Sequence, residues 1–252
     1  MKISVASCWL VFLALAAVSV SGSAQAQATA PSNPPSKEVV FPVLPKSGAD
    51  VDAFVPAGWQ LDAKTTGDLN GDGKSDLLFV LINSDPNLVM QGNPVVPRII
   101  AVAFANASGS GYTLAIQNST LLTLRVNGPT IDMMDGSQPC FAIPTPTDCS
   151  GILSIAHGAF QVFIQSTRGS GGQTFIFRFQ NGGAELIGYK DVATEGGITD
   201  TDEVNFSTGQ SVDTQQDLTS TKPGKTTKKT LPKNPLPNLQ TMGNVQDFEG
   251  TY

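Results

Sequence analysis

Short apolar runs, some alternating with polar positions, recur along this chain. In Phe175–Phe179 the phenylalanines fall on one side of an extended backbone, whereas Thr174, Ile176 and Arg178 fall on the other. Because successive side chains of a strand point to opposite faces, this pattern predicts a strand with one face in a core. Leu77–Ile82 is apolar at every position, which is typical of a strand buried on both faces.

Further runs of this kind are separated by turns that contain glycine and asparagine. We expect strands at 77–82, 98–105, 112–117, 121–126, 152–156, 159–165, 173–180 and 185–189. Asn181-Gly182-Gly183 predicts a hairpin turn and Lys222-Pro223-Gly224-Lys225 a type II turn. No amphipathic helix of useful length is recognisable. The pattern therefore predicts an all-β fold, an antiparallel meander forming a sandwich or a partial propeller-like sheet.

The amino terminus has the form of a secretory signal. Lys2 precedes the twelve-residue apolar stretch Trp9–Val20, and Ala24-Gln25-Ala26 supplies small residues at a cleavage site. The apolar stretch is shorter than the about 20 residues that span a bilayer. We expect residues 1–26 to be removed and the product to be periplasmic or secreted, without a transmembrane segment.

The mature chain divides by composition. We expect a Pro/Ala/Ser-rich leader at 27–50 with an edge strand at 39–44, a β domain at 51–210, an exposed hairpin at 211–232 and a tail at 233–252. The full chain has a net charge of −6, and loss of Lys2 makes it −7. Five lysines between 222 and 233 lie in a stretch without acids, so the rest sums to −12. Such an acidic body argues against nucleic acid as a partner, whereas the lysine run is either a solvated face or a surface for anions.

Two cysteines remain after the signal. Cys140 and Cys149 flank eight residues, among them two prolines. In an oxidising compartment this arrangement favours a disulfide that closes a short loop. The alternatives are free thiols or a metal site, and the second lacks a nearby histidine or further cysteine.

The segment GDLNGDGKSDLLFVL, residues 67–81, carries the clearest chemistry. Asp68, Asn70, Asp72 and Asp76 place oxygen side chains at positions 1, 3, 5 and 9 of a loop at 67–77, and Lys74 offers its backbone carbonyl at position 7. Ca²⁺ takes about six to eight oxygen ligands, and this spacing supplies most of them. The sequence therefore predicts a calcium site that pins the loop to the following strand.

Two other interpretations of the loop have different consequences. An EF-hand needs a glutamate at the twelfth position, where this chain has Phe79 inside the apolar strand, so that motif is rejected. A turn without an ion is the other alternative, since Asp, Asn and Gly are favoured in turns. Three converging carboxylates would then repel one another, which favours the bound cation.

This loop resembles the calcium loop of FG-GAP and VCBS-type repeats. A wider resemblance is to uncharacterised exported bacterial proteins with a single such loop, carried by Gly58-Trp59, residues 177–180 with 186–189, and residues 204–209. The resemblance implies Ca²⁺ as a ligand of Asp68, Asn70, Asp72, Asp76 and the Lys74 carbonyl, and an extracytoplasmic location. It implies no reaction. The chain has one clear copy of the loop, so the sequence gives no support to a regular propeller.

Catalysis has little support in the sequence. His157 is the one histidine, and no G-x-S-x-G motif accompanies it. The glutamates have no recognisable setting for paired-carboxylate chemistry. We expect a non-catalytic binding or envelope-associated module whose partner is an unidentified protein or glycan. A secreted hydrolase with an unrecognised site, for which His157 is the best candidate, is the alternative.

Overall fold

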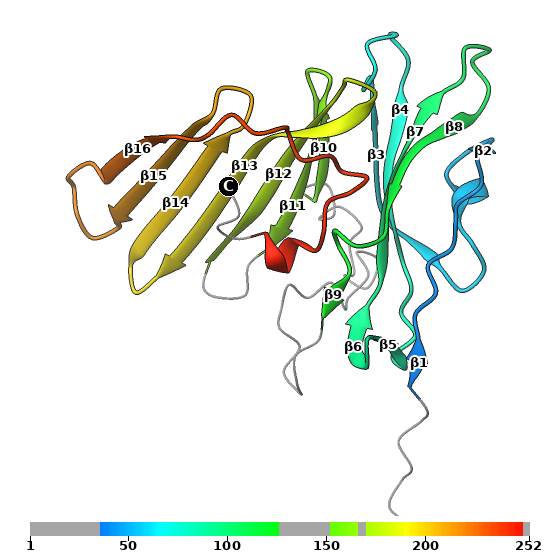
Figure 1. The fold of residues 1–252 in the computed structure, drawn as a ribbon, viewed down its shortest axis with the longest axis horizontal. Coiled ribbons are helices and arrows are strands. Elements are labelled where there is room, and N and C mark those ends of the chain that lie inside the picture. Colours follow the sequence, from blue (N-terminus) through cyan, green and yellow to red (C-terminus); the bar gives the residue numbers. More distant parts are fainter. Residues whose placement is uncertain (1–35, 126–151, 166–169, 249–252) are drawn as a thin grey trace, which may run out of the picture. The chain divides into compact units, whose positions relative to one another are not determined.

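The computed structural model describes residues 36–125, 152–165 and 170–248 of the chain. Within these ranges the chain forms strands joined by turns, and the helical segments are short 3-10 turns at Asp52–Phe54 and Val245–Asp247 (Figure 1). The predicted all-β class is confirmed, and the antiparallel sheets agree with a sandwich. None of the helical segments in these ranges is long and apolar enough to cross a membrane.

One sheet has five strands and contains the strand that the sequence predicts to be wholly buried. Its order is β2 (Ser47–Gly48), β8 (Tyr112–Asn118), β7 (Arg98–Ala105), β4 (Asp76–Ile82) and β3 (Gln60–Gly67). All neighbouring pairs are antiparallel. Every residue of β4 is buried, because β4 lies inside the sheet and both of its faces are covered.

A second sheet has seven strands in sequence order, each antiparallel to the next. They are β10 (Leu153–Ala156), β11 (Ala159–Gln165), β12 (Ser170–Gln180), β13 (Gly183–Glu195), β14 (Ile198–Asn205), β15 (Gln210–Asp217) and β16 (Lys225–Thr230). The sequence predicted the first four of these, although β13 extends well beyond residue 189, and it predicted β15 and β16 as the exposed hairpin at 211–232. Strand β14 carries polar residues at most of its positions, which is why its pattern gave no strand signal.

A small sheet corrects two predictions. It consists of β1 (Lys37–Glu38), β5 (Leu88–Met90), β6 (Asn93–Val96) and β9 (Leu124–Arg125). The expected edge strand at 39–44 is wrong, because the strand in this region is β1 at Lys37–Glu38, which pairs with β5 in parallel. In the irregular segment 39–44 that follows, Leu44 is buried, whereas Val40 and Val43 are exposed. The strand expected at 121–126 begins later than predicted, at Leu124 of β9, because Leu121 and Leu122 are buried in the turn before it. Residue 126 lies outside the described residues.

The two faces of β4 pack into different cores. Leu78 and Val80 join a large core with residues of the seven-stranded sheet, such as Phe177, whereas Leu77 and Phe79 join a second core. The second core includes Phe54, whose ring centroid lies 5.5 Å from that of Phe79. An unbroken apolar run is therefore required at β4, as the sequence indicates.

The phenylalanines of β12 lie in the large core as predicted. Phe175 and Phe177 are fully buried, and Phe179 packs at the margin, where its ring lies 4.7 Å from that of Phe104. Tyr189 of β13 also lies in this core, with its ring 5.1 Å from that of Phe175. Aromatic pairs at these separations add to the stabilisation from burial.

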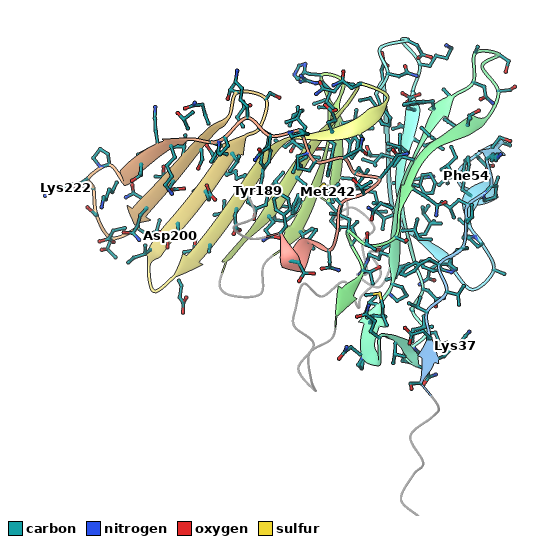
Figure 2. The ribbon with its side chains drawn as sticks, viewed as in Figure 1. Lys37, Phe54, Tyr189, Asp200, Lys222 and Met242 are labelled. Atoms are coloured by element: carbon teal, nitrogen blue, oxygen red, sulfur yellow. The ribbon has the colours of Figure 1, made fainter. Side chains whose placement is uncertain are left out.

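The segment after β16 returns to the large core. Leu239, Met242 and Val245 are buried there, and Figure 2 labels Met242 together with Tyr189 of the same core. The buried Asn118 ties this segment to the end of β8, since its Nδ2 donates to the carbonyls of Leu239 and Met242. Its Oδ1 accepts from the Leu121 amide at 2.7 Å.

Candidate metal-binding loop

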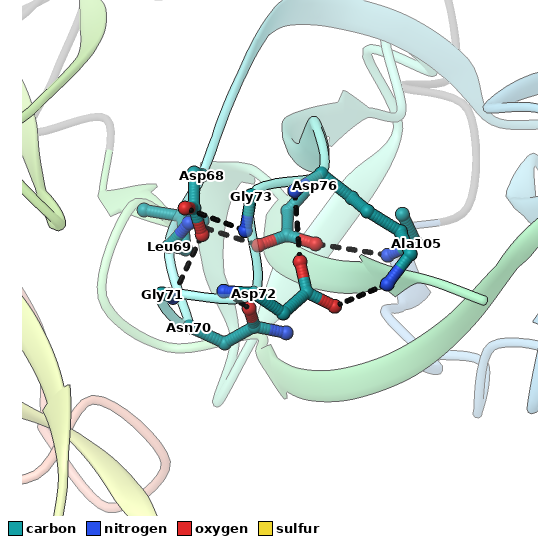
Figure 3. A network of polar contacts seen from close by, with 9 residues as sticks. Asp68, Leu69, Asn70, Gly71, Asp72, Gly73, Asp76 and Ala105 are labelled. Atoms are coloured by element: carbon teal, nitrogen blue, oxygen red, sulfur yellow. Dashed lines mark hydrogen bonds and ion pairs between the residues drawn. The ribbon is translucent and has the colours of Figure 1, made fainter. Parts of the chain in front are cut away.

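The predicted metal loop joins β3 to β4 and is ordered by its own side chains. Asp68 accepts hydrogen bonds from two loop amides, those of Gly71 at 2.7 Å and Gly73 at 2.9 Å, one on each carboxylate oxygen. Asn70 Oδ1 accepts from the Asp72 amide at 2.9 Å. These contacts, drawn in Figure 3, fold the backbone tightly around the first three polar residues.

Glycine is required at two positions of this turn. Gly71 and Gly73 have φ values of 80° and 79°, in the left-handed region that a Cβ atom disfavours. In the alternating pattern of the sequence, the acidic side chains therefore accept hydrogen bonds and the glycines allow the backbone to turn. The inward-pointing backbone amides of the loop donate to the side-chain oxygens.

Asp76 has a different position from the other polar residues of the loop. Its side chain is fully buried, and its two oxygens accept from the amides of Leu69 at 2.8 Å and Ala105 at 2.9 Å. Figure 3 shows this carboxylate between the loop and the end of β7. Asp76 therefore fastens the loop and β7 to the start of β4, a role that the sequence does not reveal because Ala105 is remote along the chain.

Asp72 and Lys74 form an exposed ion pair. Lys74 Nζ lies 3.0 Å from Asp72 Oδ2, and the Lys74 amide donates to Asp72 Oδ1 at 2.9 Å. The hydrogen bond from the Lys74 ammonium is the largest cause that lowers the pKa of the Asp72 carboxyl. A cation that uses Asp72 would therefore compete with the side chain of Lys74.

The donors in the loop fit a hard cation in kind. Asp68, Asn70 and Asp72 offer side-chain oxygens and Lys74 a carbonyl, which is the chemistry Ca²⁺ prefers. In the described ranges, however, no three His, Cys, Asp or Glu side chains are grouped so as to hold a metal ion. An ion in this loop would depend on Asn70, the Lys74 carbonyl and water besides the carboxylates.

The remaining predicted residues lie elsewhere. His157 is exposed in the turn between β10 and β11, where it has a left-handed φ of 53° and precedes Gly158 with φ of 68°. These are the positive φ values that a two-residue hairpin turn requires. Cys140 and Cys149 lie outside the described residues.

A second group of titratable residues was not predicted. Asp191, Asp202 and Asp213 stand directly opposite one another on β13, β14 and β15, because the strand register aligns them. With Asp200, labelled in Figure 2, they line a groove of about 400 Å³. Lys229, on the neighbouring strand β16, places its Nζ 2.8 Å from Asp213 Oδ2. No sequence motif marks this group, since the residues meet only through pairing.

The pKa values of the two facing aspartates, Asp202 and Asp213, are shifted in opposite directions. Burial raises the pKa of Asp202 to about 6, and the hydrogen bond and charge of Asp213 act in the same direction. The Lys229 ammonium, chiefly through its hydrogen bond, lowers the pKa of Asp213. Asp202 thus tends to hold a proton that Asp213 lacks.

Comparison of the chain with protein-family models, curated proteins and solved structures finds no match.

Proposed function

We propose that this chain is an exported β-domain protein that Ca²⁺ stabilises at residues 67–77 and that acts as a non-catalytic binding or envelope-associated module. The observation that carries the proposal is the loop itself. The oxygens of Asp68, Asn70 and Asp72 are already ordered by loop amides before β4 begins. The signal-like amino terminus supports an extracytoplasmic location, where millimolar Ca²⁺ is common enough for a weak site.

The ion would serve stability. Asp68, Asn70, Asp72 and the Lys74 carbonyl would hold it. Asp76, which the sequence also predicts as a ligand, would instead keep the loop attached to β4, because both of its oxygens accept from backbone amides. Ca²⁺ supplies positive charge that offsets the repulsion between the carboxylates. Sites of this kind in extracellular modules bind with dissociation constants of ~0.1–1 mM. The ion would therefore stiffen the connection between β3 and a strand buried on both faces.

Among the described residues no hydrogen bond or ion pair links His157 to an acidic side chain, which supports a binding role. Its side chain is exposed on a hairpin turn. The partner proposed here is a protein or a glycan of the envelope.

Thermal unfolding with Ca²⁺ and with EGTA tests the calcium proposal. At a tenfold excess of Ca²⁺ over its dissociation constant, we expect about 1.4 kcal/mol of stabilisation, or a rise in Tm of about 3–5 °C. Asp68→Asn should lose this response. Asp85→Asn is a matched control, because Asp85 also caps an amide in a turn, that of Asn87, but lies outside the loop. Equal midpoints in Ca²⁺ and EGTA would overturn the calcium proposal.

A secreted hydrolase is the second candidate, and one observation favours it. Asp202 and Asp213 face each other beside a groove, and their pKa values are pushed in opposite directions. Such a separation is the property that lets one carboxyl donate a proton while the other stays ionised. A broad hydrolase screen of the parent chain and of Asp202→Asn distinguishes the two candidate functions. Activity that this variant abolishes would favour the enzyme over the binding module.

A further inference from the structure

The edge strands of the described sheets differ in how they are protected against pairing with another chain. Strands β1, β2 and β9 are edges of only two residues each. At β10, Ile155 packs on Gly67 of β3 so closely that a Cβ at Gly67 would lie 2.7 Å from its Cγ2 atom. Strand β3 itself bulges between Leu61 and Ala63. Shortening, covering and bulging are the usual ways to block pairing with another chain.

Strand β16 is the exception among the described edges. It has six residues, all exposed, and ends the seven-stranded sheet. No residue of β16 belongs to either hydrophobic core. Its side chains attach it to β15 through the Lys229–Asp213 ion pair and through hydroxyl contacts such as that of Thr226 with Thr214 at 3.3 Å. Burial therefore gives no reason for a full-length strand at this position.

The direction of the backbone groups of β16 follows from the register. The Leu231 amide donates to the Gly209 carbonyl at 2.8 Å, and the pairs from Gln210–Thr230 to Gln215–Lys225 continue in step. In an antiparallel ladder alternate residues bond to the partner strand. Residues 225, 227 and 229 thus bond to β15, whereas residues 226, 228 and 230 direct their amides and carbonyls to the open side.

The charges along β16 indicate which kind of strand could pair with its open edge. Lys225 and Lys229 lie on one face of the sheet and Lys228 on the other, so a strand added here would meet positive charge on both faces. A second copy of β16 would set lysine beside lysine, which disfavours self-pairing. An acidic strand is favoured, and β15 already shows this pairing through Asp213 and Lys229.

We propose that the open edge of β16 is the binding surface of this module and takes an extended, acidic segment of a partner protein as an additional strand. The inference rests on the proposed binding function and names its surface. Backbone groups at 226, 228 and 230 supply main-chain hydrogen bonds, and the lysines supply specificity. A glycan lacks the regular row of amides and carbonyls that this edge matches.

Peptide binding to the full mature chain tests the proposal. The probes are a fluorescent eight-residue peptide of alternating threonine and glutamate and its threonine–lysine counterpart, followed by anisotropy. We expect the acidic peptide to bind, with affinity that falls as NaCl rises from about 0.05 to about 0.5 M, since exposed charges are screened. The basic peptide should not bind.

Two variants at one position separate the backbone from the charge. Lys228→Pro removes the outward amide and the charge, while Lys228→Gln removes the charge alone. Proline is tolerated on an edge strand when its nitrogen faces solvent, so both variants should melt close to the parent protein. We expect Lys228→Pro to bind the acidic peptide about tenfold more weakly than Lys228→Gln, the effect of one lost hydrogen bond.

The outcomes are distinct from those of the calcium test. Equal binding by Lys228→Pro and Lys228→Gln, or equal binding of acidic and basic peptides, overturns the edge proposal. No peptide binding at all also overturns it and assigns the lysines to protection against aggregation. A Ca²⁺-dependent Tm in the same preparations would leave the calcium-stabilised module standing in each case.

Discussion

The carboxylate of Asp76 accepts a hydrogen bond from the backbone amide of Ala105 at 2.9 Å, and so joins the first residue of β4 to the last residue of β7. The other oxygen of the same carboxylate accepts from Leu69 in the loop. One buried side chain thus holds two strands and the candidate metal loop together.

Asp76→Ala should destabilise the protein by about 2–5 kcal/mol, because the buried Leu69 amide and the partly buried Ala105 amide would lose their acceptor. Asp76→Asn keeps one acceptor oxygen and should cost about half as much. Urea unfolding in EGTA measures both, so that any bound ion does not contribute. The loop variant Asp72→Asn, whose side chain is partly exposed, serves as a control that should change little under the same conditions. Unchanged stability of Asp76→Ala would contradict the proposed role of this hydrogen-bonded carboxylate.

Lys74→Gln should bind Ca²⁺ more tightly than the parent chain. Lys74 Nζ lies 3.0 Å from Asp72 Oδ2, so a cation bound in the loop would compete with the ammonium for this oxygen. An exposed ion pair of this kind is weak, so the expected gain in affinity is about two- to fivefold. Calorimetric titration measures the dissociation constant, with Lys64→Gln on β3 as the charge-matched control. An affinity no higher than that of the parent chain would contradict the competition between Lys74 and the ion for Asp72.

The facing aspartates of β14 and β15 predict a pH-dependent stability. Asp202 has a pKa of about 6 in the folded chain against an ordinary value of 3.8, so its contribution to stability is present below pH 3.8 and is lost as pH rises through 6. Asp213, whose pKa is lowered, acts in the opposite sense and loses its contribution at acid pH. Between pH 4 and 7, stability due to Asp202 should therefore fall.

Asp202→Asn isolates this effect, since asparagine mimics the protonated side chain. Because Asp202 is only partly buried and solvent screens its charge, we expect the parent chain to lose only about 1 kcal/mol relative to the variant between about pH 4 and pH 7. Urea midpoints at several pH values measure the difference. Asp200→Asn, on the same strand and face, is the control. Parallel profiles for the parent chain and Asp202→Asn would refute the shift.

The buried pair of Asp62 and Arg98 predicts a strong coupling between two positions. Arg98 Nε lies 2.8 Å from Asp62 Oδ2, with both side chains more than nine-tenths buried. Arg98→Met alone should cost about 3–5 kcal/mol because it leaves a buried carboxylate without its cation. The double variant Asp62→Leu/Arg98→Met should recover most of that loss. A double-mutant cycle in urea tests this, and additive losses would contradict it.

The sequence predicted the fold best where one residue type decides the environment. The unbroken apolar run of β4 and the alternating phenylalanines of β12 both indicated their burial correctly. Strand β14 was missed because most of its positions are polar, so neither alternation nor apolarity marks it. It forms a strand because its neighbours offer backbone partners, which a local pattern does not record.

The candidate site was predictable in its turn chemistry and unpredictable in its long-range contacts. The spacing of Asp68, Asn70 and Asp72 with glycines indicated a tight loop, and the structure shows the side-chain oxygens ordering it. The buried position of Asp76 depends on Ala105, and the meeting of Asp202 with Asp213 depends on strand register. Both arise from pairing between distant segments.

The position of the last core residues affects how the chain reaches its native state. Leu239, Met242 and Val245 complete the large core. Asn118, at the end of β8, donates hydrogen bonds to the carbonyls of Leu239 and Met242. A nascent chain that has emerged only as far as Thr230 has made every described strand yet leaves this interior exposed and Asn118 without those acceptors. Completion of the large core therefore requires the carboxyl-terminal segment, and a truncation before Leu239 should yield a product vulnerable to proteolysis.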